Sequence, residues 1–505
     1  MASSSPIVMT TFWSLDGDGP LHRQLYRALR GAILDGALPP GTRLPSSRAL
    51  TRDLGLSRTP ILLAYEQLLA EGYAAGRRGS GTYVAGELAP RTIPRNAAPP
   101  APGPIRLSRF GRRAVESARG LPAWRLRDAA LPYDFRYGRP AYGDFPHETW
   151  CRVLARSARH ASVRALDYGQ PEGLLALREA VADHASRTRA VRCTAEDVVI
   201  VNGSQQALDL STRVLVEPGD AVVLEEPHYA GARRVLEAIG ARLRSVPVDA
   251  DGLCVERLPR AARLAYVTPS HQFPTGAVLP VSRRLALLAW AERGGAYVVE
   301  DDYDGEYRYT GRPVESLQGL DRSARVLYVG TFSKALFPSL RLGYLIVPPA
   351  LRRAVRAAKG LADTGCSTLE QSALATFIRD GHFARHVSRS RARTADRRSA
   401  LLAAIAAHFG ERALVCGADA GLHVLVWLRG VPAERLPGIV RDAEALGVGV
   451  YPVTPHCLVP PREAGLVLGY AALTAEEIRE GIRRLADAIP LTLRPRHSPF
   501  ERPKR

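Results

Sequence analysis

Lysine is rare in this chain, which makes each lysine a candidate for chemistry that arginine does not perform. The 505-residue sequence has three lysines, Lys334, Lys359 and Lys504, and uses arginine at its other strongly basic positions. Only a neutral amine forms a Schiff base, and lysine gives up its proton in a protein far more readily than arginine. Lys504 lies in a basic tail and Lys359 in an arginine-rich segment, so we expect both at the surface. Lys334 is therefore the candidate nucleophile.

The residues around Lys334 predict a site for an aldehyde cofactor that carries a phosphate. Thr331 and Ser333 come shortly before Lys334, and Arg341 follows it by seven residues, in a run that begins after a predicted strand. Such a cofactor requires an amine at one end and phosphate ligands at the other, and a guanidinium binds phosphate through two parallel hydrogen bonds. We predict that Lys334 supplies the amine and that Thr331, Ser333 and Arg341 hold the phosphate.

A second predicted strand, Tyr297–Glu300, ends in two carboxylates and a phenol. In open α/β sheets, ligands bind at the carboxyl ends of the strands. A carboxylate at that edge pairs with a protonated ring nitrogen, and a phenol two residues later reaches a ring hydroxyl. We assign Asp301 to the ring nitrogen and Tyr303 to the hydroxyl, and we expect one of the two aspartates, Asp301 or Asp302, to be a solvated loop acid.

Two further turns fit the same cofactor. Asn202–Leu208 leads from a strand into a helix, and backbone amides at a helix N-terminus bind phosphate. The side chains of Ser204 and Gln205 are within reach there, and Tyr229, after another strand, is predicted to stack on the ring. The six cysteines lie far apart with no CxxC spacing, which argues against a disulfide scaffold or a zinc site, and we predict no metal.

Residues 131–490 alternate short β-rich runs with helix-length segments, as in an α/β domain with a mostly parallel sheet. The runs are Val198–Val201, Ala221–Leu224, Ala265–Thr268, Tyr297–Glu300, Val326–Val329 and Tyr344–Val347. After about residue 390 the pattern changes to two strands, His423–Leu428 and Gly447–Tyr451, with helices near 434–446 and 475–488. We therefore predict a large α/β domain followed by a small α+β lobe.

Residues 15–85 predict a winged helix-turn-helix, because three helices are followed by a hairpin with a basic tip. Helices are expected over 21–34, over 47–54 and from residue 57, and the hairpin tip over 76–81. The start of the third helix enters the major groove in such domains. The predicted DNA contacts are Ser57, Arg58 and Thr59 on this helix, Ser46 and Arg48 before it, and Arg77 and Arg78 at the wing. Taken singly, Ser57 is also explained as a helix cap and each arginine as part of a solvated face.

The rest of the chain is compatible with a nucleic-acid-binding protein of the cytoplasm. The formal net charge of +19 favours nucleic acid as a partner, although an arginine-rich coding bias explains the same excess. Residues 86–130 are rich in proline and arginine and are predicted to be a linker whose later part, around Trp124, docks on the α/β domain. Residues 491–505 are predicted to be a basic tail. No apolar run is long enough for a membrane span, and no secretory signal is evident.

The first unit resembles the DNA-binding domain of the GntR family, through Pro20–Leu25, Gly41–Arg48, Leu56–Thr59 and Gly79–Val84. Residues 131–490 resemble fold-type-I aminotransferases in the order of turn, aromatic residue, Pro274-Thr275-Gly276, aspartate, lysine and arginine. The sequences of Ser270–Gly276 and Glu300–Asp304 are similar to those of the MocR subfamily of GntR regulators.

This resemblance implies a regulator that binds operator DNA, works as a head-to-tail homodimer and carries pyridoxal 5'-phosphate on Lys334. It also implies that Tyr168, in Asp167–Gly173, reaches the phosphate across the dimer interface. The fold is then used for sensing rather than for turnover, and the effector is pyridoxal phosphate itself, an amine or an amino acid.

The sequence departs from amino-acid-binding relatives where they hold the substrate carboxylate. Gly465–Ala471 contains no arginine, and Tyr229 is followed by Ala230 and Gly231, although Arg233 is near. A buried carboxylate without a cationic partner is costly, which disfavours an ordinary α-amino acid as effector. Two alternatives stay open: an active aminotransferase with an appended DNA-binding domain, and a scaffold that keeps the fold without the cofactor.

Overall fold

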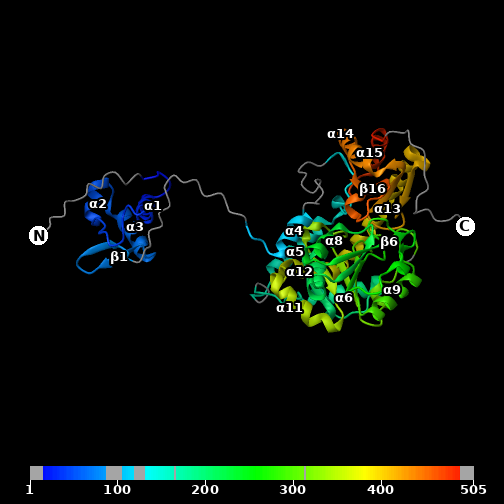
Figure 1. Ribbon diagram of the computed structural model, residues 1–505, viewed down its shortest axis with the longest axis horizontal. Helices are drawn as coiled ribbons and strands as arrows, with labels where there is room; N and C mark the ends of the chain where they lie inside the picture. The colour runs from blue at the N-terminus through cyan, green and yellow to red at the C-terminus, as the bar shows by residue number, and fades with distance from the viewer. Residues whose placement is uncertain (1–14, 87–104, 119–130, 164–166, 312–313, 490–505) are drawn as a thin grey trace. The chain divides into compact units, whose positions relative to one another are not determined.

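The computed structural model describes residues 15–86, 105–118, 131–163, 167–311 and 314–489 (Figure 1). The chain divides into two compact units, residues 1–106 and residues 107–505, each of which is described by itself. Among the described residues no helix is both long and apolar enough to cross a membrane. The predicted docking segment around Trp124 and the predicted tail 491–505 lie outside the described residues.

The first unit is a three-helix domain with a two-stranded wing. Its elements are α1 (Leu21–Leu34), α2 (Ser47–Leu54), α3 (Arg58–Ala70), β1 (Ala74–Arg77) and β2 (Gly81–Val84). Leucine and isoleucine side chains at helical spacing form its core, including Leu25, Leu29, Leu50, Ile61 and Leu68. The Ser46 hydroxyl caps α2 by accepting from the Ala49 amide, and α2 stops at Gly55, whose φ of 65° favours glycine. The predicted winged helix-turn-helix is confirmed.

The second unit is built on an eight-stranded sheet. In spatial order its strands are β4 (Val198–Val201), β11 (Gly343–Ile346), β10 (Val326–Thr331), β9 (Tyr297–Asp302), β8 (Leu264–Val267), β5 (Ala221–Glu226), β6 (Arg242–Asp249) and β7 (Gly252–Leu253). The five strands from β10 to β6 are parallel, whereas β11 and β7 run antiparallel to their neighbours. The predicted mostly parallel sheet is confirmed.

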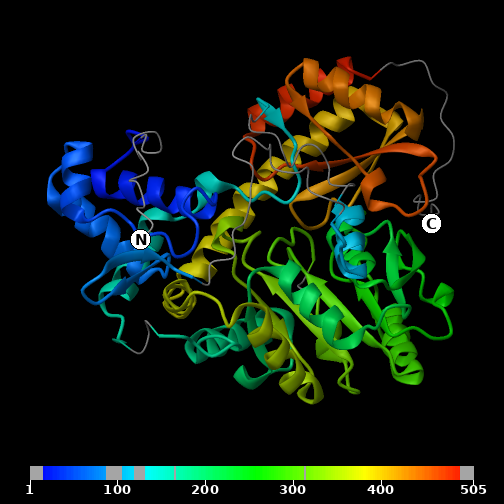
Figure 2. The same ribbon diagram turned by 60° about the vertical axis from the view of Figure 1, so that its left-hand side comes forward.

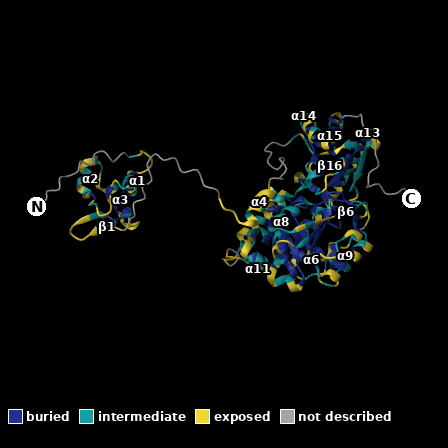
Figure 3. Cartoon of the chain, viewed as in Figure 1, coloured by how far each residue is buried: buried dark blue, intermediate teal, exposed yellow. Residues whose placement is uncertain are grey.

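Helices cover both faces of this sheet. One face packs against α7 (Ser204–Leu215), α8 (Ala230–Ile239) and α11 (Arg352–Asp363). The other packs against α5 (His147–Arg159), α6 (Leu175–Arg189), α9 (Val281–Gly294), α10 (Leu317–Leu320) and α12 (Thr368–Arg379). Successive strand residues point to opposite faces, so Val199 and Val201 join the first core while Val198 and Ile200 join the second. The strands β4, β8, β10 and β11 are accordingly buried along their length (Figure 3), whereas the first half of β6 is largely exposed.

A small lobe follows the large domain in the chain and lies at one end of it (Figures 1 and 2). Its antiparallel sheet has the order β12 (Ala413–Cys416), β13 (His423–Pro432), β16 (Glu463–Gly469) and β15 (Tyr451–Pro452). Its helices are α13 (His382–Phe409), α14 (Leu436–Ala445) and α15 (Ala475–Asp487). The early strand β3 (Tyr133–Asp134) pairs with β14 (Val448–Gly449), so this N-terminal part of the second unit belongs to the small lobe.

Part of the predicted linker is a helix of the second unit. The helix α4 (Arg109–Ala118) packs on α8, where Nη1 of Arg113 donates to the carbonyl oxygen of Ile239 at 3.1 Å. The guanidinium of Arg213 lies 5.4 Å from the ring centroid of Phe110 on the same helix. The first helix of the second unit therefore packs at the C-terminal end of α8.

The expectation that Lys359 lies at the surface is wrong. Its side chain on α11 is fully buried, because Val355, Lys359 and Asp363 follow one another at four-residue spacing and the first two face the core. Its Nζ donates to Oδ1 of Asp363 at 2.5 Å. A charge is tolerated in such a place when a partner of opposite charge is provided, as it is here.

Candidate functional site

Nine of the ten predicted cofactor residues line one cavity of about 490 Å³ in the second unit. They are Ser204, Gln205, Tyr229, Asp301, Tyr303, Thr331, Ser333, Lys334 and Arg341. The parallel strands β9 and β10 end at this cavity, α7 begins there, and β13 of the small lobe contributes His423. The tenth residue, Tyr168, is 88 % exposed and does not line the cavity. Its predicted contact lies between two copies of the chain and stays a prediction.

Lys334 presents its amine to the cavity through a contact with the segment that enters from the small lobe. Its Nζ donates to the carbonyl oxygen of Gly138 at 2.8 Å. Gly138 has a φ of +77°, and a Cβ there would lie 2.8 Å from the same Nζ, so a larger residue would displace the amine. Sequence reasoning missed Tyr137 and Gly138, because nothing in their local pattern marks a site 196 residues away from Lys334.

Hydroxyls, backbone amides and a guanidinium converge where α7 begins. Gly203 precedes α7 with a φ of +80°, and Nη2 of Arg341 donates to the carbonyl oxygen of Asn202 at 2.7 Å. A Cβ at Gly203 would come within 2.8 Å of the Arg341 guanidinium, so only glycine leaves this approach open. The free amides of the first turn of α7 begin at Ser204, and together with the positive charge of Arg341 they form a site that suits an anion such as a phosphate.

The two aspartates at the end of β9 have different surroundings. Oδ2 of Asp301 accepts from the Tyr266 hydroxyl at 2.8 Å, and Oδ1, at the wall of the cavity, is buried with no hydrogen-bond partner among the described residues. Burial raises the pKa of Asp301 to about 7. Asp302 points to the other side, where its Oδ2 accepts from Nε of Arg189 and from the Tyr328 hydroxyl, each at 2.6 Å. Both carboxylates are buried, so the expectation of a solvated loop acid is wrong.

Two tyrosines complete the wall around Asp301. The ring of Tyr229 packs on Gly231. A Cβ at that position would lie 2.3 Å from the ring, so a residue larger than glycine would displace Tyr229. The hydroxyl of Tyr303 lies 2.9 Å from Nδ1 of His271, and burial raises its pKa well above the ordinary value. The hydroxyl of Tyr303 therefore keeps its proton at neutral pH.

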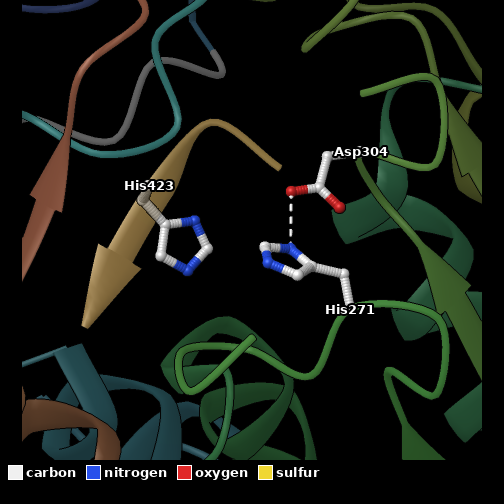
Figure 4. A group of neighbouring side chains, drawn as sticks. All are labelled: His271, Asp304 and His423. Carbon is white, nitrogen blue, oxygen red and sulfur yellow. Dashed lines mark hydrogen bonds and ion pairs between the residues drawn. The ribbon is translucent and has the colours of Figure 1, made fainter. Parts of the chain in front are cut away.

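The structure adds a buried group that sequence reasoning did not assign. His271, Asp304 and His423 lie together beside the cavity, with ligand-type atoms within 4.8 Å of one another (Figure 4). His271 and Asp304 stand in segments that carry the family resemblance, but His423 comes from the small lobe, and only the tertiary fold brings it to them. Such a donor set suits a divalent metal, which the sequence did not predict.

The arginine that reaches the cavity from α8 is not the one that the sequence singled out. Nε of Arg233 donates to Oε1 of Glu237 at 2.7 Å, one turn along the same helix. The next residue, Arg234, lines the cavity. The cavity thus has two guanidiniums, those of Arg234 and Arg341.

In the first unit, the predicted DNA contacts Ser46, Arg48, Ser57, Arg58, Thr59, Arg77 and Arg78 are all exposed. Nε of Arg58 lies 3.4 Å from the Ser47 hydroxyl, which links the starts of α2 and α3. The side chain of Ser57 makes no capping hydrogen bond, whereas that of Ser46 does. Arg77 ends β1 with its guanidinium 4.7 Å from the Tyr83 ring centroid, so the tip of the wing is shorter than predicted and begins at Arg78. These contacts stay predictions.

Comparisons with known proteins agree with this arrangement. The family described as bacterial regulatory proteins, gntR family, matches residues 21–84, and aminotransferase class I and II matches residues 141–485. The probable rhizopine catabolism regulatory protein MocR of Rhizobium meliloti is 40 % identical over 480 residues, which cover 94 % of each chain. The chain belongs to the MocR-type regulators of the gntR family.

Other relatives of this MocR-type regulator match most of its length. The regulator TauR of Rhodobacter capsulatus is 35 % identical over 95 % of this chain and 99 % of its own. The pyridoxine biosynthesis regulator PdxR of Corynebacterium glutamicum is 30 % identical over 93 % and 96 %. Among solved structures, the α-aminoadipate aminotransferase LysN of Thermus thermophilus, complexed with N-(5'-phosphopyridoxyl)-L-leucine, has a TM-score of 0.68 at 31 % identity and covers 76 % of this chain and 96 % of its own. The second unit thus has the fold-type-I aminotransferase fold.

Proposed function

We propose that this regulator binds operator DNA through its first unit and pyridoxal 5'-phosphate in the cavity of its second. The observation that carries the proposal is the unpartnered Oδ1 of Asp301 at the cavity wall, with the Lys334 amine and the anion site at α7 on the same cavity. A buried carboxylate oxygen without a donor is costly, and a protonated ring nitrogen would satisfy it. The donor set therefore fits the cofactor.

Each side chain has a distinct task in this proposal. When bound, pyridoxal 5'-phosphate supplies an aldehyde that accepts an amine and a ring that withdraws electrons. Lys334 presents the amine, Asp301 holds a proton at the ring nitrogen, and Tyr303 hydrogen-bonds the ring hydroxyl. Tyr229 packs on the ring face. The phosphate ligands are Ser204, Gln205, Thr331, Ser333 and Arg341.

The DNA-binding half of the proposal rests on the exposed starts of α2 and α3. Arg58 is placed to reach base edges in the major groove, while Ser57, Thr59 and the wing contact phosphates. One small winged helix covers few base pairs, so the proposed unit of binding is a head-to-tail homodimer, with Tyr168 contributing to the site of the partner subunit. Operator binding places the protein in the cytoplasm.

The proposed signal is pyridoxal phosphate itself, or an amine or amino acid that reacts with it. A ligand shifts the equilibrium between two states of the dimer only by the difference in its affinity for them. A sensing role therefore requires that occupation of the cavity changes DNA affinity, which is a measurable property.

The first experiment compares wild type with Lys334→Ala and Arg58→Ala. Absorption spectra with added pyridoxal phosphate are followed by borohydride reduction and mass spectrometry, and operator binding is measured by fluorescence anisotropy with and without the cofactor. We expect a reducible adduct at Lys334 in wild type and in Arg58→Ala, but not in Lys334→Ala. We expect cofactor-dependent DNA binding in wild type only. Identical spectra for wild type and Lys334→Ala would refute the cofactor proposal.

An active aminotransferase is the second candidate, and the position of Arg234 favours it. Gly465–Ala471 provides no arginine for the carboxylate of an amino-acid substrate. The guanidinium of Arg234 at the cavity wall is able to hold that carboxylate instead. Turnover with several amino acids that is lost in both Lys334→Ala and Arg234→Ala would establish this activity. A cofactor-bound protein without turnover would leave sensing as the function.

A further inference from the structure

Nδ1 of His271 lies within hydrogen-bond distance of two groups, and it is unable to donate to one and accept from the other at the same time. Its Nδ1 lies 2.9 Å from Oδ2 of Asp304 and 2.9 Å from the hydroxyl oxygen of Tyr303. With a proton, Nδ1 donates to Asp304; with a lone pair, it accepts from Tyr303. His271 is 3 % exposed and Asp304 2 % exposed, so water does not substitute for either partner. The position of one proton therefore decides the direction of the whole chain of hydrogen bonds.

The surroundings place that proton on Nδ1. Among the described residues, His271 is the one side chain that donates a hydrogen bond to the Asp304 carboxylate, and a buried carboxylate without a donor is costly. The other nitrogen, Nε2, is buried with no partner. A proton on Nε2 would leave both a donor and the carboxylate unsatisfied, whereas a proton on Nδ1 leaves only an acceptor, and buried orphaned donors are the rarer case in proteins.

Close packing holds the imidazole in this orientation. A Cβ at Gly276 would lie 2.8 Å from Nε2 of His271, and a Cβ at Gly421 would lie 2.1 Å from Cε1. His423 lies across from the ring (Figure 4), and its own Nε2 is 3.2 Å from the carbonyl oxygen of Pro274. These neighbours pack closely around His271, and the hydrogen bond of Nδ1 to Asp304 selects the orientation of the ring.

We propose that Asp304 and His271 are positioning residues that make Tyr303 a hydrogen-bond donor to an oxyanion on an aromatic ring in the cavity. With its proton donated to Asp304, Nδ1 offers no lone pair to the Tyr303 hydroxyl, so the phenol directs its O–H into the cavity that it lines. The inference rests on the proposed function, in which that oxyanion belongs to pyridoxal phosphate. It adds two residues, His271 and Asp304, which act on the cofactor through Tyr303.

The test is the pH dependence of the absorption of the bound cofactor. A donor stabilises the ring oxyanion and so lowers the pH at which the bound cofactor loses its proton. We expect Tyr303→Phe and His271→Leu each to raise the midpoint by about one pH unit, as for the loss of a hydrogen bond to a charged group. The double variant should shift no further than Tyr303→Phe alone. The other ionisable side chains that line the cavity are retained in all of these variants: Tyr137, Tyr229, Arg234, Tyr266, Asp301, Lys334, Arg341 and His423.

Two milder variants keep the test sharp if His271→Leu fails to fold. His271→Asn retains an N–H donor close to Nδ1 and should restore most of the wild-type midpoint. Asp304→Asn keeps the shape but offers its amide to Nδ1, which reverses the tautomer and should shift the midpoint as Tyr303→Phe does. A wild-type midpoint in Asp304→Asn and His271→Leu, or additive shifts in the double variant, would overturn the inference. Absence of any cofactor band in wild type would overturn the proposed function and this inference with it.

Discussion

Replacing Asp363 by asparagine is expected to destabilise the second unit and to weaken its phosphate turn. Oδ1 of Asp363 accepts from Nζ of the fully buried Lys359 at 2.5 Å, and Oδ2 accepts from the side-chain amides of Asn202 and Gln206 at 2.6 and 2.7 Å. Removing one partner of a buried ion pair costs about 3–5 kcal/mol, because the remaining charge is left uncompensated. Asp363 is 21 % exposed, so we take the lower end, about 3 kcal/mol.

The ion pair and the turn are separated by a double-mutant cycle. Lys359→Met removes the buried charge and leaves Asp363 with its amide donors, so it should cost less than Asp363→Asn. The double variant should resemble Lys359→Met in stability but share the weakened cofactor affinity of Asp363→Asn, because Asp363, and not Lys359, accepts from the side-chain amides of Asn202 and Gln206. Urea denaturation of the full chain, followed by tryptophan fluorescence, measures the first effect, and cofactor titration measures the second.

The control for this cycle is Glu196→Gln, which removes an exposed ion pair with Arg356 and should leave both measurements unchanged. If Asp363→Asn unfolds at the wild-type urea concentration, or if the two single variants add in the double variant, the pairing of Lys359 with Asp363 does not stabilise the fold. Lys359→Arg is also expected to lower the stability against urea, since a guanidinium is larger than the space that the ammonium fills.

Three further predictions concern the cavity and its surroundings. Burial raises the pKa of Asp301 from 3.8 to about 7, so the cofactor-free native chain binds a proton there that the unfolded chain releases, and its stability should fall as the pH rises through this window. Asp301→Asn should reduce that fall in thermal melts between pH 4 and 7, and an unchanged profile would contradict the assignment. The remaining fall is expected from Glu225 and Glu300, because burial raises the pKa of each to about 7 as well. Gly138→Ala should weaken cofactor binding by displacing the Lys334 amine, and a wild-type affinity would show that the amine moves freely. Arg113→Ala, which frees α4 from α8, should leave the affinity for the cofactor unchanged but reduce its effect on operator binding, and anisotropy titrations that show the wild-type effect would rule out this route.

Local sequence patterns are enough to predict the helices and strands and most of the residues that line the cavity. Ser46, Gly55 and the buried β-rich runs define elements through short-range chemistry, and Lys334 stands out because lysine is rare in this chain. The distinction between Asp301 and Asp302 also follows from local geometry, since neighbouring strand residues point to opposite faces. What the alternation does not reveal is that the far face holds Arg189, so that Asp302 is buried in an ion pair rather than solvated.

Residues that depend on the tertiary fold escape sequence reasoning. The arginine-rich helix around Lys359 predicts a surface position, yet the four-residue spacing from Val355 to Asp363 puts this lysine on the buried face. His423 joins His271 only because β13 of the small lobe begins beside the end of the large sheet. No spacing within either segment carries that information.

The cavity takes its walls from both lobes, so a ligand bound there contacts the large domain and the small lobe together. Phe135 packs in the core of the small lobe, and three residues later Gly138 accepts the hydrogen bond from Lys334 of the large domain. A ligand that takes up the amine removes this bond between the lobes, and one that packs on Tyr229 acts at the first turn of α8. The other end of α8 holds α4, which comes after the DNA-binding unit in the chain. Since a ligand shifts an equilibrium only through contacts that differ between its states, the Lys334–Gly138 bond and the α4–α8 contact are where that difference has to be sought.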